Sequence, residues 1–430
     1  MEAVWLIGCF VVLLLLGAPI GVCLGVCGVG AMFAFDLGYA LIPQNVVSGI
    51  ASFPLLAIPF FVLAGVILEK AGLAARIARF FELLVGRVAG GLAMVAVLTC
   101  MFWGALSGSG PATTAAVGLI LIGPMTRHGY DRHFAAGLIA NASDLSIIIP
   151  PSIAFIIYGS LVDDVSVGAL FVAGIVPGLL IGAAIMAVAW WLSWRRGYRG
   201  VRAQGSFREI LTALKESIWA LLAPVIILGG IYLGIFVPTE AAVVAVFYSL
   251  FVAVVVYRSI RLRDLPRVFV DAAVLSSVIM FIVAFAGVFS TAVSTLGITD
   301  QLAQGIIRVA PTPLVMILLV NLLLLGLGMF LDAISISYLV IPLLVPVLRA
   351  LGIDPLWYGV IFVTALAIGQ TTPPVGVNLF AAANLVDGDV DRVARNVVPY
   401  VLTSVAVLVV LSLFPALSTW LPRVAGLVGS

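Results

Sequence analysis

The chain has 430 residues, 63% of them hydrophobic and 9% charged, and its net charge at pH 7 is +2. About a quarter of the residues of a soluble domain are charged, so this composition excludes a soluble protein with a large core. A spanning helix needs roughly 20 apolar residues, so the length predicts on the order of ten to twelve membrane passes. No basic patch carries interleaved aromatic residues, and nucleic acid is therefore not an expected partner.

Apolar segments follow one another along the whole chain, separated by short loops. Most cations lie in four of these loops, at 70–87, 127–132, 195–215 and 258–267, which is typical of the cytoplasmic side of a membrane protein. Two amphipathic stretches, 72–87 and 206–217, are expected to lie at the membrane surface. The predicted membrane segments cover about 3–35, 53–69, 90–106, 112–126, 134–162, 167–194, 218–236, 239–257, 270–292, 312–330, 334–348, 357–386 and 397–421.

Two short features favour structural roles. "VPTEAAVV" (237–244) predicts a helix start, with Thr239 as the cap and Glu240 in the first turn. Cys23 and Cys27 share a helix face, but no His or carboxylate lies near them. They are expected to be small packing residues rather than metal ligands.

The two halves of the chain repeat each other at a constant offset of 223 residues. Gly129 and Asp131 fall on Gly352 and Asp354, and Pro150-Pro151 fall on Pro373-Pro374. The polar stretch 194–209 is the best boundary between the halves. We therefore predict a first repeat over 1–200, with a hairpin around 131–151, and a second over 201–430, with a hairpin around 354–374.

Loop charge indicates that the two repeats are inverted relative to each other. The first Gly-x-Asp turn lies in "TRHGYDRH", which carries two Arg and two His, whereas the second lies in "LRALGIDPLW", with one Arg. Cationic turns stay on the cytoplasmic side, so the two turns are predicted on opposite sides. Inverted repeats are the architecture of many secondary transporters.

Each repeat has two places where a membrane helix is expected to break. One is a Gly-rich stretch, 104–111 or 326–332, and the other is a Pro-Pro stretch, 141–151 or 369–375. A helix, a turn at Gly-x-Asp and a re-entrant hairpin with a Pro-Pro tip fit this spacing. Broken backbone exposes carbonyls that suit Na⁺, and is tolerated only inside protein or beside a cavity. The alternative is a set of kinked packing helices.

Two carboxylates lie within these broken segments. Asp332 is expected either to support a cation site or to cap the following helix, and Asp144 to bind a cation, carry a proton or pair with an Arg. Asn321, Asn384 and Asn396 are expected to form hydrogen bonds between helices.

No constellation favours an enzyme. The two histidines, His128 and His133, lie in a charged loop, and neither an H-E-x-x-H nor a Walker motif is present. "SGSG" lacks a nearby base, so Ser107 and Ser109 are expected to be hydroxyl ligands. An intramembrane enzyme and a non-transporting scaffold remain as alternatives.

Four stretches resemble the large membrane subunit of tripartite ATP-independent periplasmic (TRAP) transporters, the DctM type: "GALSGSGPATTAAVG" (104–118), 129–159, "VPTEAAVVAVFYSL" (237–250) and 352–380. The resemblance implies an all-α polytopic membrane protein of the elevator type, with an inverted repeat and two opposed re-entrant hairpins. It implies a multi-pass protein of the bacterial inner membrane that imports organic acids with a Na⁺ gradient. The implied partners are a small four-helix membrane subunit and a periplasmic substrate-binding protein.

The resemblance also implies two Na⁺ sites, each where a tip meets the broken helix of its own half. The first would use Ser107 and Ser109 with the carbonyls before Pro150, and the second Gly326 or Gly328 with Gly369, Thr372 and Val375. Asp144, Ser146 and Asp332 are added as candidate ion ligands. The remaining small and polar residues of the two breaks are candidate substrate contacts: Asn141, Ser143, Ser152, Thr371, Gly376 and Asn378.

The first break departs from the family pattern. The family commonly has a sequence close to "SSTIGPIIPPS", whereas this chain has "ASDLSIIIPPS", with Asp144 in place of Thr and Ser146 in place of Gly. We expect Asp144 to alter ion coupling, with H⁺ uptake through this residue as one alternative. Another alternative is a stand-alone carrier of the divalent-anion/Na⁺ symporter type, which needs no binding protein.

Overall fold

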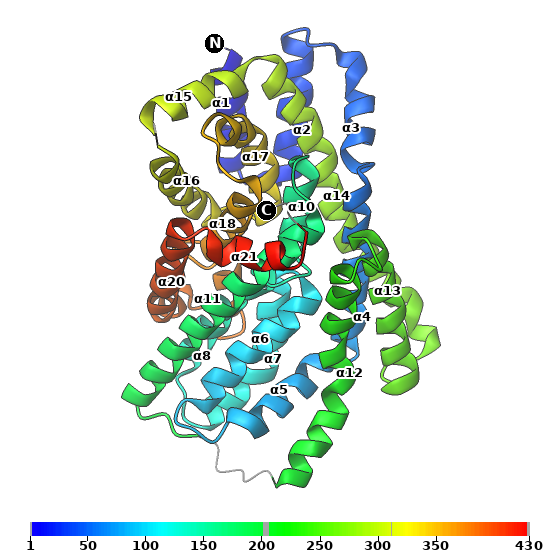
Figure 1. The fold of residues 1–430 in the computed structure, drawn as a ribbon, viewed down its shortest axis with the longest axis vertical. Helices are drawn as coiled ribbons and strands as arrows, with labels where there is room; N and C mark the ends of the chain where they lie inside the picture. Colours follow the sequence, from blue (N-terminus) through cyan, green and yellow to red (C-terminus); the bar gives the residue numbers. More distant parts are fainter. Residues whose placement is uncertain (1, 201–205, 311, 428–430) are drawn as a thin grey trace.

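The computed structural model describes residues 2–200, 206–310 and 312–427. Within them the regular elements are helical, and seven helices are long and apolar enough to cross a membrane, or eight if a bent pair counts as one span. The predicted all-α polytopic membrane fold is confirmed. The helices form two groups, which we call the frame and the body (Figure 1).

The frame consists of helices from the start and middle of the chain, and α3, α4 and α13 lie on the right in Figure 1. Its helices are α1 (Glu2–Leu15), α2 (Ile20–Ala34), α3 (Ile42–Ile50), α4 (Ala57–Lys70), α12 (Phe207–Tyr232), α13 (Pro238–Leu250) and α14 (Leu265–Thr295). Short 3₁₀ turns at Tyr39–Leu41, Phe53–Leu56 and Leu262–Asp264 and a π-helical turn at Phe251–Val256 join them.

Glycines let the longest frame helix approach its neighbour. A Cβ atom on Gly28 of α2 would lie 2.9 Å from the Phe289 backbone nitrogen of α14. Gly21 and Gly25, on the same face, lie against Phe281 and Phe285. Because lipid supplies no hydrophobic drive between helices, such close backbone packing holds membrane helices together.

The body contains the remaining spans. Its helices are α6 (Gly91–Ser107), α7 (Gly110–Arg127), α8 (Arg132–Ala142), α9 (Leu145–Ile148), α10 (Ile153–Leu161), α11 (Val167–Arg195), α16 (Pro313–Gly328), α17 (Ala333–Ala350), α18 (Pro355–Gly369), α19 (Val377–Ala383) and α20 (Val390–Leu413). Three shorter helices, α5 (Leu73–Val85), α15 (Ile298–Val309) and α21 (Ala416–Val424), accompany the two groups.

The helix boundaries of the body repeat along the chain. Three pairs of helices begin 223 residues apart: α7 and α17 at Gly110 and Ala333, α8 and α18 at Arg132 and Pro355, and α11 and α20 at Val167 and Val390. This is the offset predicted from the sequence. The predicted boundary at residue 200 borders residues 201–205, which lie outside the described residues, and it stays a prediction.

The first re-entrant hairpin is α6–α7, not the Pro-Pro segment expected at 131–151. The Gly90 N–H, before α6, donates to the Tyr198 carbonyl (3.3 Å), and the Asp131 N–H, after α7, donates to the Tyr198 hydroxyl (3.2 Å). Both ends of α6–α7 therefore lie together. Gly108, at φ +61°, supplies the left-handed residue that reverses the chain.

The Pro150-Pro151 segment is instead a break within a crossing span. Helical residues 132–148 and 153–161 differ in direction by only 41°, so the chain continues across the break. Two prolines remove backbone donors and interrupt the helix, but they do not by themselves reverse the chain. The span ends near Asp164, which pairs with Arg349 (3.1 Å) at the end of the body opposite Tyr198.

The second half repeats this arrangement in the opposite sense. Asn321 of α16 and Trp357 of α18 both bond to the C-terminal turn of α20, at Ser412 and the Leu411 carbonyl (3.0 Å each). The start of α16 and the end of α17 therefore lie together at the end of the body near Arg349. The segment 354–374, which was expected to form a hairpin, is instead the second broken span. In Figure 1 α16–α17 lies towards the top and α6–α7 towards the bottom.

One local expectation was wrong and two were confirmed. Val237, not Thr239, caps α13, because the Glu240 carboxylate accepts its N–H (3.0 Å) while the Thr239 hydroxyl is buried without a described partner. The stretch 206–217 forms the first part of α12, which continues to Tyr232, and its place at the membrane surface stays a prediction. Asn321 and Asn396 do join helices, to Ser412 and Arg196.

Candidate functional site

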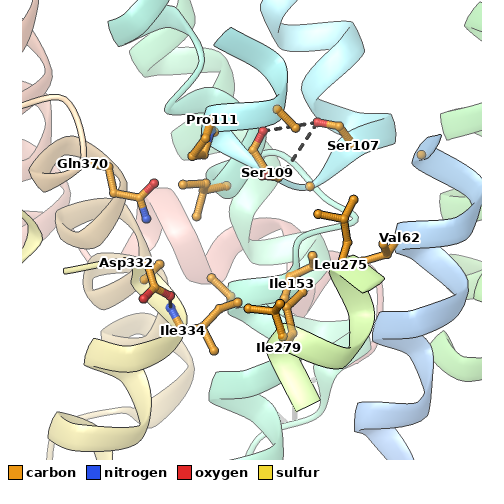
Figure 2. A pocket seen from close by; sticks show the side chains of 18 of the residues that line it. Val62, Ser107, Ser109, Pro111, Ile153, Leu275, Ile279, Asp332, Ile334 and Gln370 are labelled. Carbon is orange, nitrogen blue, oxygen red and sulfur yellow. Dashed lines mark hydrogen bonds between the residues drawn. The ribbon is translucent and has the colours of Figure 1, made fainter. Parts of the chain in front are cut away.

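A cavity of about 320 Å³ lies where the two hairpin tips of the body face the frame (Figure 2). The frame supplies apolar side chains of α4 and α14 and the carboxylate of Glu69 on α4. The body supplies the α6–α7 tip, residues on both sides of the first break, the start of α17 and Gln370 in the second break. The main lining residues are Val62, Val66, Glu69, Trp103, Ser107, Ser109, Pro111, Ile153, Leu275, Val278, Ile279, Asp332, Ile334 and Gln370.

The first hairpin tip packs against the break of its own half. A Cβ atom on Gly104 would lie 2.5 Å from Ser146 Cα, so α6 and the break meet backbone to backbone. At the tip, a Cβ atom on Gly108 would lie 3.3 Å from the Pro151 carbonyl oxygen. The Ser107 hydroxyl is bonded to the Thr113 hydroxyl (2.7 Å) and faces the cavity. This places hydroxyl and carbonyl oxygens side by side at the tip.

The second tip meets its own break in the same manner. A Cβ atom on Gly328 would lie 2.8 Å from Gly369 Cα, and the Gly376 N–H donates to the Met329 carbonyl (2.7 Å). Asp332 caps α17 by accepting the N–H groups of Ile334 (3.0 Å) and Ser335 (3.2 Å). The capping role foreseen for Asp332 is therefore present, and its carboxylate also lines the cavity.

The predicted ion ligands divide between the cavity and the tip–break contacts. Ser107, Ser109 and Asp332 line the cavity. Ser146, Gly328 and Gly369 lie at the two glycine contacts, whereas Gly326 has open space beside it. The Thr372 hydroxyl bonds to the Ile368 carbonyl (2.7 Å), and Val375 is half-buried in the same break. Their roles as ligands stay predictions.

The predicted substrate contacts lie behind the cavity wall. None of the six residues lines the cavity, and Ser143 and Ser152 are held by carbonyls of their own segment, at Ile139 (2.7 Å) and Ile147 (2.5 Å). Gly376 is buried at the contact with Met329. The others, Asn141, Thr371 and Asn378, surround Asp144.

Asp144 is a buried carboxylate, 1% exposed, that joins the two broken spans. Its Oδ2 atom accepts from Asn141 Nδ2 (3.0 Å), and its Oδ1 atom accepts from Asn378 Nδ2 (2.8 Å) and from the Thr371 hydroxyl. Asn141 and Asp144 belong to the first half, and Thr371 and Asn378 to the second. One acid thus ties together residues more than 220 positions apart.

The charged side chains that line the cavity are both acidic. They are Glu69, at the end of α4, and Asp332, whereas no Lys, Arg or His of the described residues is among the lining. Glu69, Trp103 and Gln370 were missed from the sequence. Glu69 directly precedes Lys70, where the sequence predicts the start of a charged loop, and Gln370 lies within the predicted break 369–375, directly before its two threonines. Its place in that break was the one signal that could have identified Gln370.

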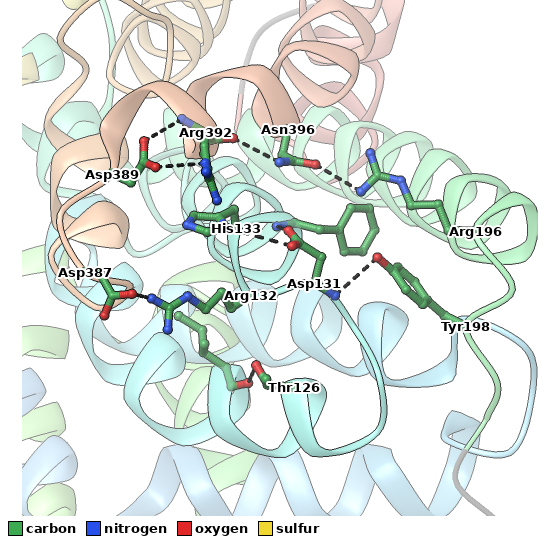
Figure 3. A network of polar contacts seen from close by, with 12 residues as sticks. Thr126, Asp131, Arg132, His133, Arg196, Tyr198, Asp387, Asp389, Arg392 and Asn396 are labelled. Atoms are coloured by element: carbon green, nitrogen blue, oxygen red, sulfur yellow. Dashed lines mark hydrogen bonds and ion pairs between the residues drawn. The ribbon is translucent and has the colours of Figure 1, made fainter.

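A polar network lies at the end of the body that holds the start of α6 and the end of α7 (Figure 3). Arg132 forms an ion pair with Asp387, Arg392 pairs with Asp389 (3.0 Å), and Arg196 donates to Asn396 (3.0 Å). These contacts join the starts of α8 and α20 to the end of α11. We call this the basic end; it carries Arg127, Arg132, Arg195, Arg196 and Arg392.

Comparisons with known proteins agree with this architecture. The family model described as "Tripartite ATP-independent periplasmic transporter, DctM component" matches residues 7–417. The C4-dicarboxylate TRAP transporter large permease protein DctM of Pseudomonas aeruginosa is 41% identical over 87% of this chain and 87% of its own length.

A longer relative and a solved structure extend the comparison. The isethionate TRAP transporter permease protein DctMQ of Oleidesulfovibrio alaskensis is 37% identical over 96% of this chain, which spans 65% of that protein. The crystal structure of the YdaH transporter of Alcanivorax borkumensis covers 90% of this chain and 89% of its own, with a TM-score of 0.56 at 15% identity, a likeness of fold. By its family match and its relatives, the chain belongs to the DctM family of TRAP transporter large permeases.

Proposed function

We propose that this chain is the translocating subunit of a secondary transporter that imports organic acid anions with a Na⁺ gradient. The two relatives named above are permeases for C4-dicarboxylates and for isethionate, and both cargoes are small organic anions. A cavity of about 320 Å³ is within the range that holds a small molecule. The cargo class proposed here is therefore a small anion with a carboxylate or sulfonate group.

The observation that carries Na⁺ coupling is the charge of the cavity. Its two charged lining residues, Glu69 and Asp332, are acidic. They repel a bound anion, and this repulsion is strong where water is excluded and the dielectric constant is low. A cation bound at the same time removes this repulsion. Carbonyl and hydroxyl oxygens at the tips, at Ser107 and Ser109 and around Gly328 and Thr372, are hard ligands that suit Na⁺.

The frame side of the cavity supports an elevator movement of the body. Val62, Val66, Leu275, Val278 and Ile279 present an apolar wall towards the hairpin tips. Such a wall offers no hydrogen bonds that would have to break when the body slides past the frame. The two tip–break contacts and the Asp144 network keep the body together as it moves.

The charge asymmetry supports the orientation. The basic end is proposed to face the cytoplasm of a bacterium, with the chain in the inner membrane. The opposite end, with Asp163 and Asp164, then faces the periplasm, where a substrate-binding protein delivers the anion. A small four-helix membrane subunit is the third proposed component.

Reconstitution of all three components in proteoliposomes tests the proposal. Labelled anion is expected to accumulate when Na⁺ is outside, and not when K⁺ replaces it. Ser107→Ala and Thr372→Val are expected to raise the Na⁺ concentration needed for half-maximal uptake, because each removes a proposed oxygen ligand. Thr364→Val is the matched control, since the Thr364 hydroxyl is buried and has no hydrogen-bond partner among the described residues.

Two outcomes would contradict the proposal. Equal uptake in Na⁺ and in K⁺ would exclude Na⁺ coupling. Uptake by this chain without the binding protein would instead favour a stand-alone carrier of the divalent-anion type.

A further inference from the structure

Two polar side chains that line the cavity have no hydrogen-bond partner among the described residues. Trp103 on α6 is 1% exposed, and its indole nitrogen is buried without an acceptor. Gln370, directly after α18, is 3% exposed, and its side-chain amide makes no hydrogen bond within the described part of the chain. A buried donor without an acceptor is destabilising, so both groups require an explanation.

The backbone holds both side chains at the cavity. The Gln370 N–H donates to the Leu366 carbonyl (3.2 Å), and the Gln370 carbonyl accepts the N–H of Asn378 (3.0 Å). Figure 2 shows the amide of Gln370 directed from the second break towards the cavity. Trp103 directly precedes Gly104, whose backbone contact with the first break fixes this turn of α6. Both groups are therefore held in place before any cargo binds.

The chemistry of the two groups fits an acid group. An indole N–H is a donor only, and the NH₂ of a glutamine amide has two donor hydrogens, whereas an ionised carboxylate is an acceptor only. Among the described residues the cavity lining includes no Lys, Arg or His. An acid group in this cavity is therefore held by neutral donors. The oxygens of the two tips cannot serve, since they are acceptors proposed for Na⁺.

The repeat provides this pair of donors only once. At the 223-residue offset Trp103 falls on Gly326, and Gln370 falls on Ile147, which also lines the cavity. Neither equivalent has a polar side chain. Each half thus supplies one donor, and the two donors suffice for one acid group. A second acid group would lie in the same cavity as two carboxylates, without an equivalent pair of donors.

We propose that Trp103 and Gln370 bind the acid group of the cargo, and that the cargo is an organic monoanion with a single carboxylate or sulfonate group. This rests on the proposed function. The Trp103 Nε1–H and the Gln370 Nε2–H each donate to an oxygen of that group, while the remainder of the cargo packs against the apolar wall of α4 and α14. Both donors belong to the body, so the anion travels with it.

The test measures the binding of three anions to the purified full chain in detergent and saturating Na⁺. They are isethionate, with one acid group, succinate, with two, and monomethyl succinate, which keeps the carbon chain of succinate but only one acid group. The rise in unfolding temperature with anion concentration gives each dissociation constant. The wild type is expected to bind isethionate and monomethyl succinate at least about tenfold more tightly than succinate, a difference of about 1.4 kcal/mol.

Two substitutions remove the donors and two serve as matched controls. Trp103→Phe keeps an aromatic ring, and Gln370→Met keeps the length of the side chain. Each is expected to weaken isethionate binding by about tenfold or more, because a hydrogen bond to a charged group is lost. The controls are Trp357→Phe and Gln44→Met. Trp357 donates to the Leu411 carbonyl (3.0 Å), Gln44 is exposed on α3, and neither lines the cavity, so both should keep the wild-type affinity.

A measurement without anion separates a lost donor from a damaged fold or ion site. The unfolding temperature shows whether each variant is folded. The Na⁺ concentration that gives half-maximal stabilisation is expected to equal that of the wild type in Trp103→Phe and in Gln370→Met. If Trp103→Phe does not fold, Gln370→Met decides alone. Gln370→Glu, which replaces the donor with a third acid, is then expected to weaken binding further than Gln370→Met does.

The outcomes separate this inference from the proposed function. Wild-type affinity in the folded donor variants would overturn the roles of Trp103 and Gln370. Succinate binding as tight as that of its monomethyl ester, or no binding of either monoanion, would overturn the single acid group. Na⁺-driven uptake that persists alongside these results would leave the proposed function standing alone. Lost anion binding in both variants, with equal wild-type uptake in Na⁺ and K⁺, would support the donors while contradicting Na⁺ coupling.

Discussion

The two breaks of the body share a backbone geometry but differ in chemistry. In the first half Gly104 meets Ser146, and in the second Gly328 meets Gly369, at the same 223-residue offset to within one position. The first break carries the acid, Asp144, while the second carries a hydroxyl and an amide that bind it. The repeat therefore preserves how the chain packs, and the side chains assign different tasks to its two copies.

The shared part of the comparison predicts the largest effects. Gly104→Ala and Gly328→Ala each place a methyl group 2.5–2.8 Å from a backbone atom. Overpacking of this kind costs about 1–3 kcal/mol, and we expect both variants to unfold at lower temperature and to lose most uptake. Gly123→Ala on α7 is the control, because its nearest neighbour is the end of the flexible Arg127 side chain at 3.8 Å.

Thermal unfolding in detergent and uptake in proteoliposomes measure these effects. Wild-type stability in either variant would show that the two tip–break contacts are loose and do not define the common geometry.

The two hairpin tips differ in their caps. Asp332 accepts two N–H groups at the start of α17, whereas Ser109 makes no side-chain cap at the start of α7. Asp332→Ala is expected to lower the free energy of unfolding by about 1 kcal/mol, and Ser109→Ala by only a few tenths. Asp332→Asn, which keeps an oxygen acceptor, should recover most of the loss. Equal losses in the free energy of unfolding for Asp332→Ala and Ser109→Ala would show that the two tips do not differ in the contribution of their helix caps.

A tyrosine pair tests the contact between the halves. The Tyr158 hydroxyl on α10 donates to the Pro355 carbonyl (2.9 Å), whereas the buried Tyr358 hydroxyl has no partner among the described residues. Tyr158→Phe is expected to cost about 0.5–1.5 kcal/mol, the usual contribution of one hydrogen bond. Tyr358→Phe should be neutral or slightly stabilising, as measured by chemical unfolding. A larger loss of stability in Tyr358→Phe than in Tyr158→Phe would mean that the Tyr158–Pro355 hydrogen bond does not stabilise the contact between the halves.

The smallest effect is expected at the end opposite the basic end. Arg349 and Asp164 pair across the halves at 3.1 Å, but both side chains are about 60% exposed. Exposed ion pairs contribute about 0–1 kcal/mol and are screened by salt. Arg349→Gln is therefore expected to change stability by less than about 0.5 kcal/mol in 0.15 M salt. A larger loss that persists at 1 M salt would mean that this pair helps to hold the halves together.

Local properties of the sequence were sufficient for the membrane class, the repeat and the positions of the breaks. Apolar content predicts a membrane protein because lipid excludes charge, and Pro-Pro and Gly-rich stretches mark breaks because they interrupt the helix ladder. Asp332 as a helix cap also follows from its position, since capping acts within one turn.

Only the tertiary structure decided which break reverses the chain and what surrounds each acid. The Pro-Pro stretches could be hairpin tips or kinks by composition alone, and packing made them kinks of 41° in the first half while the SGSG stretch makes the turn. Two of the three partners of Asp144, Thr371 and Asn378, lie 227 and 234 residues away. A pairing at that distance leaves no local periodicity, because hydropathy and propensity act within a few turns, whereas the contact forms only when both broken spans are packed together.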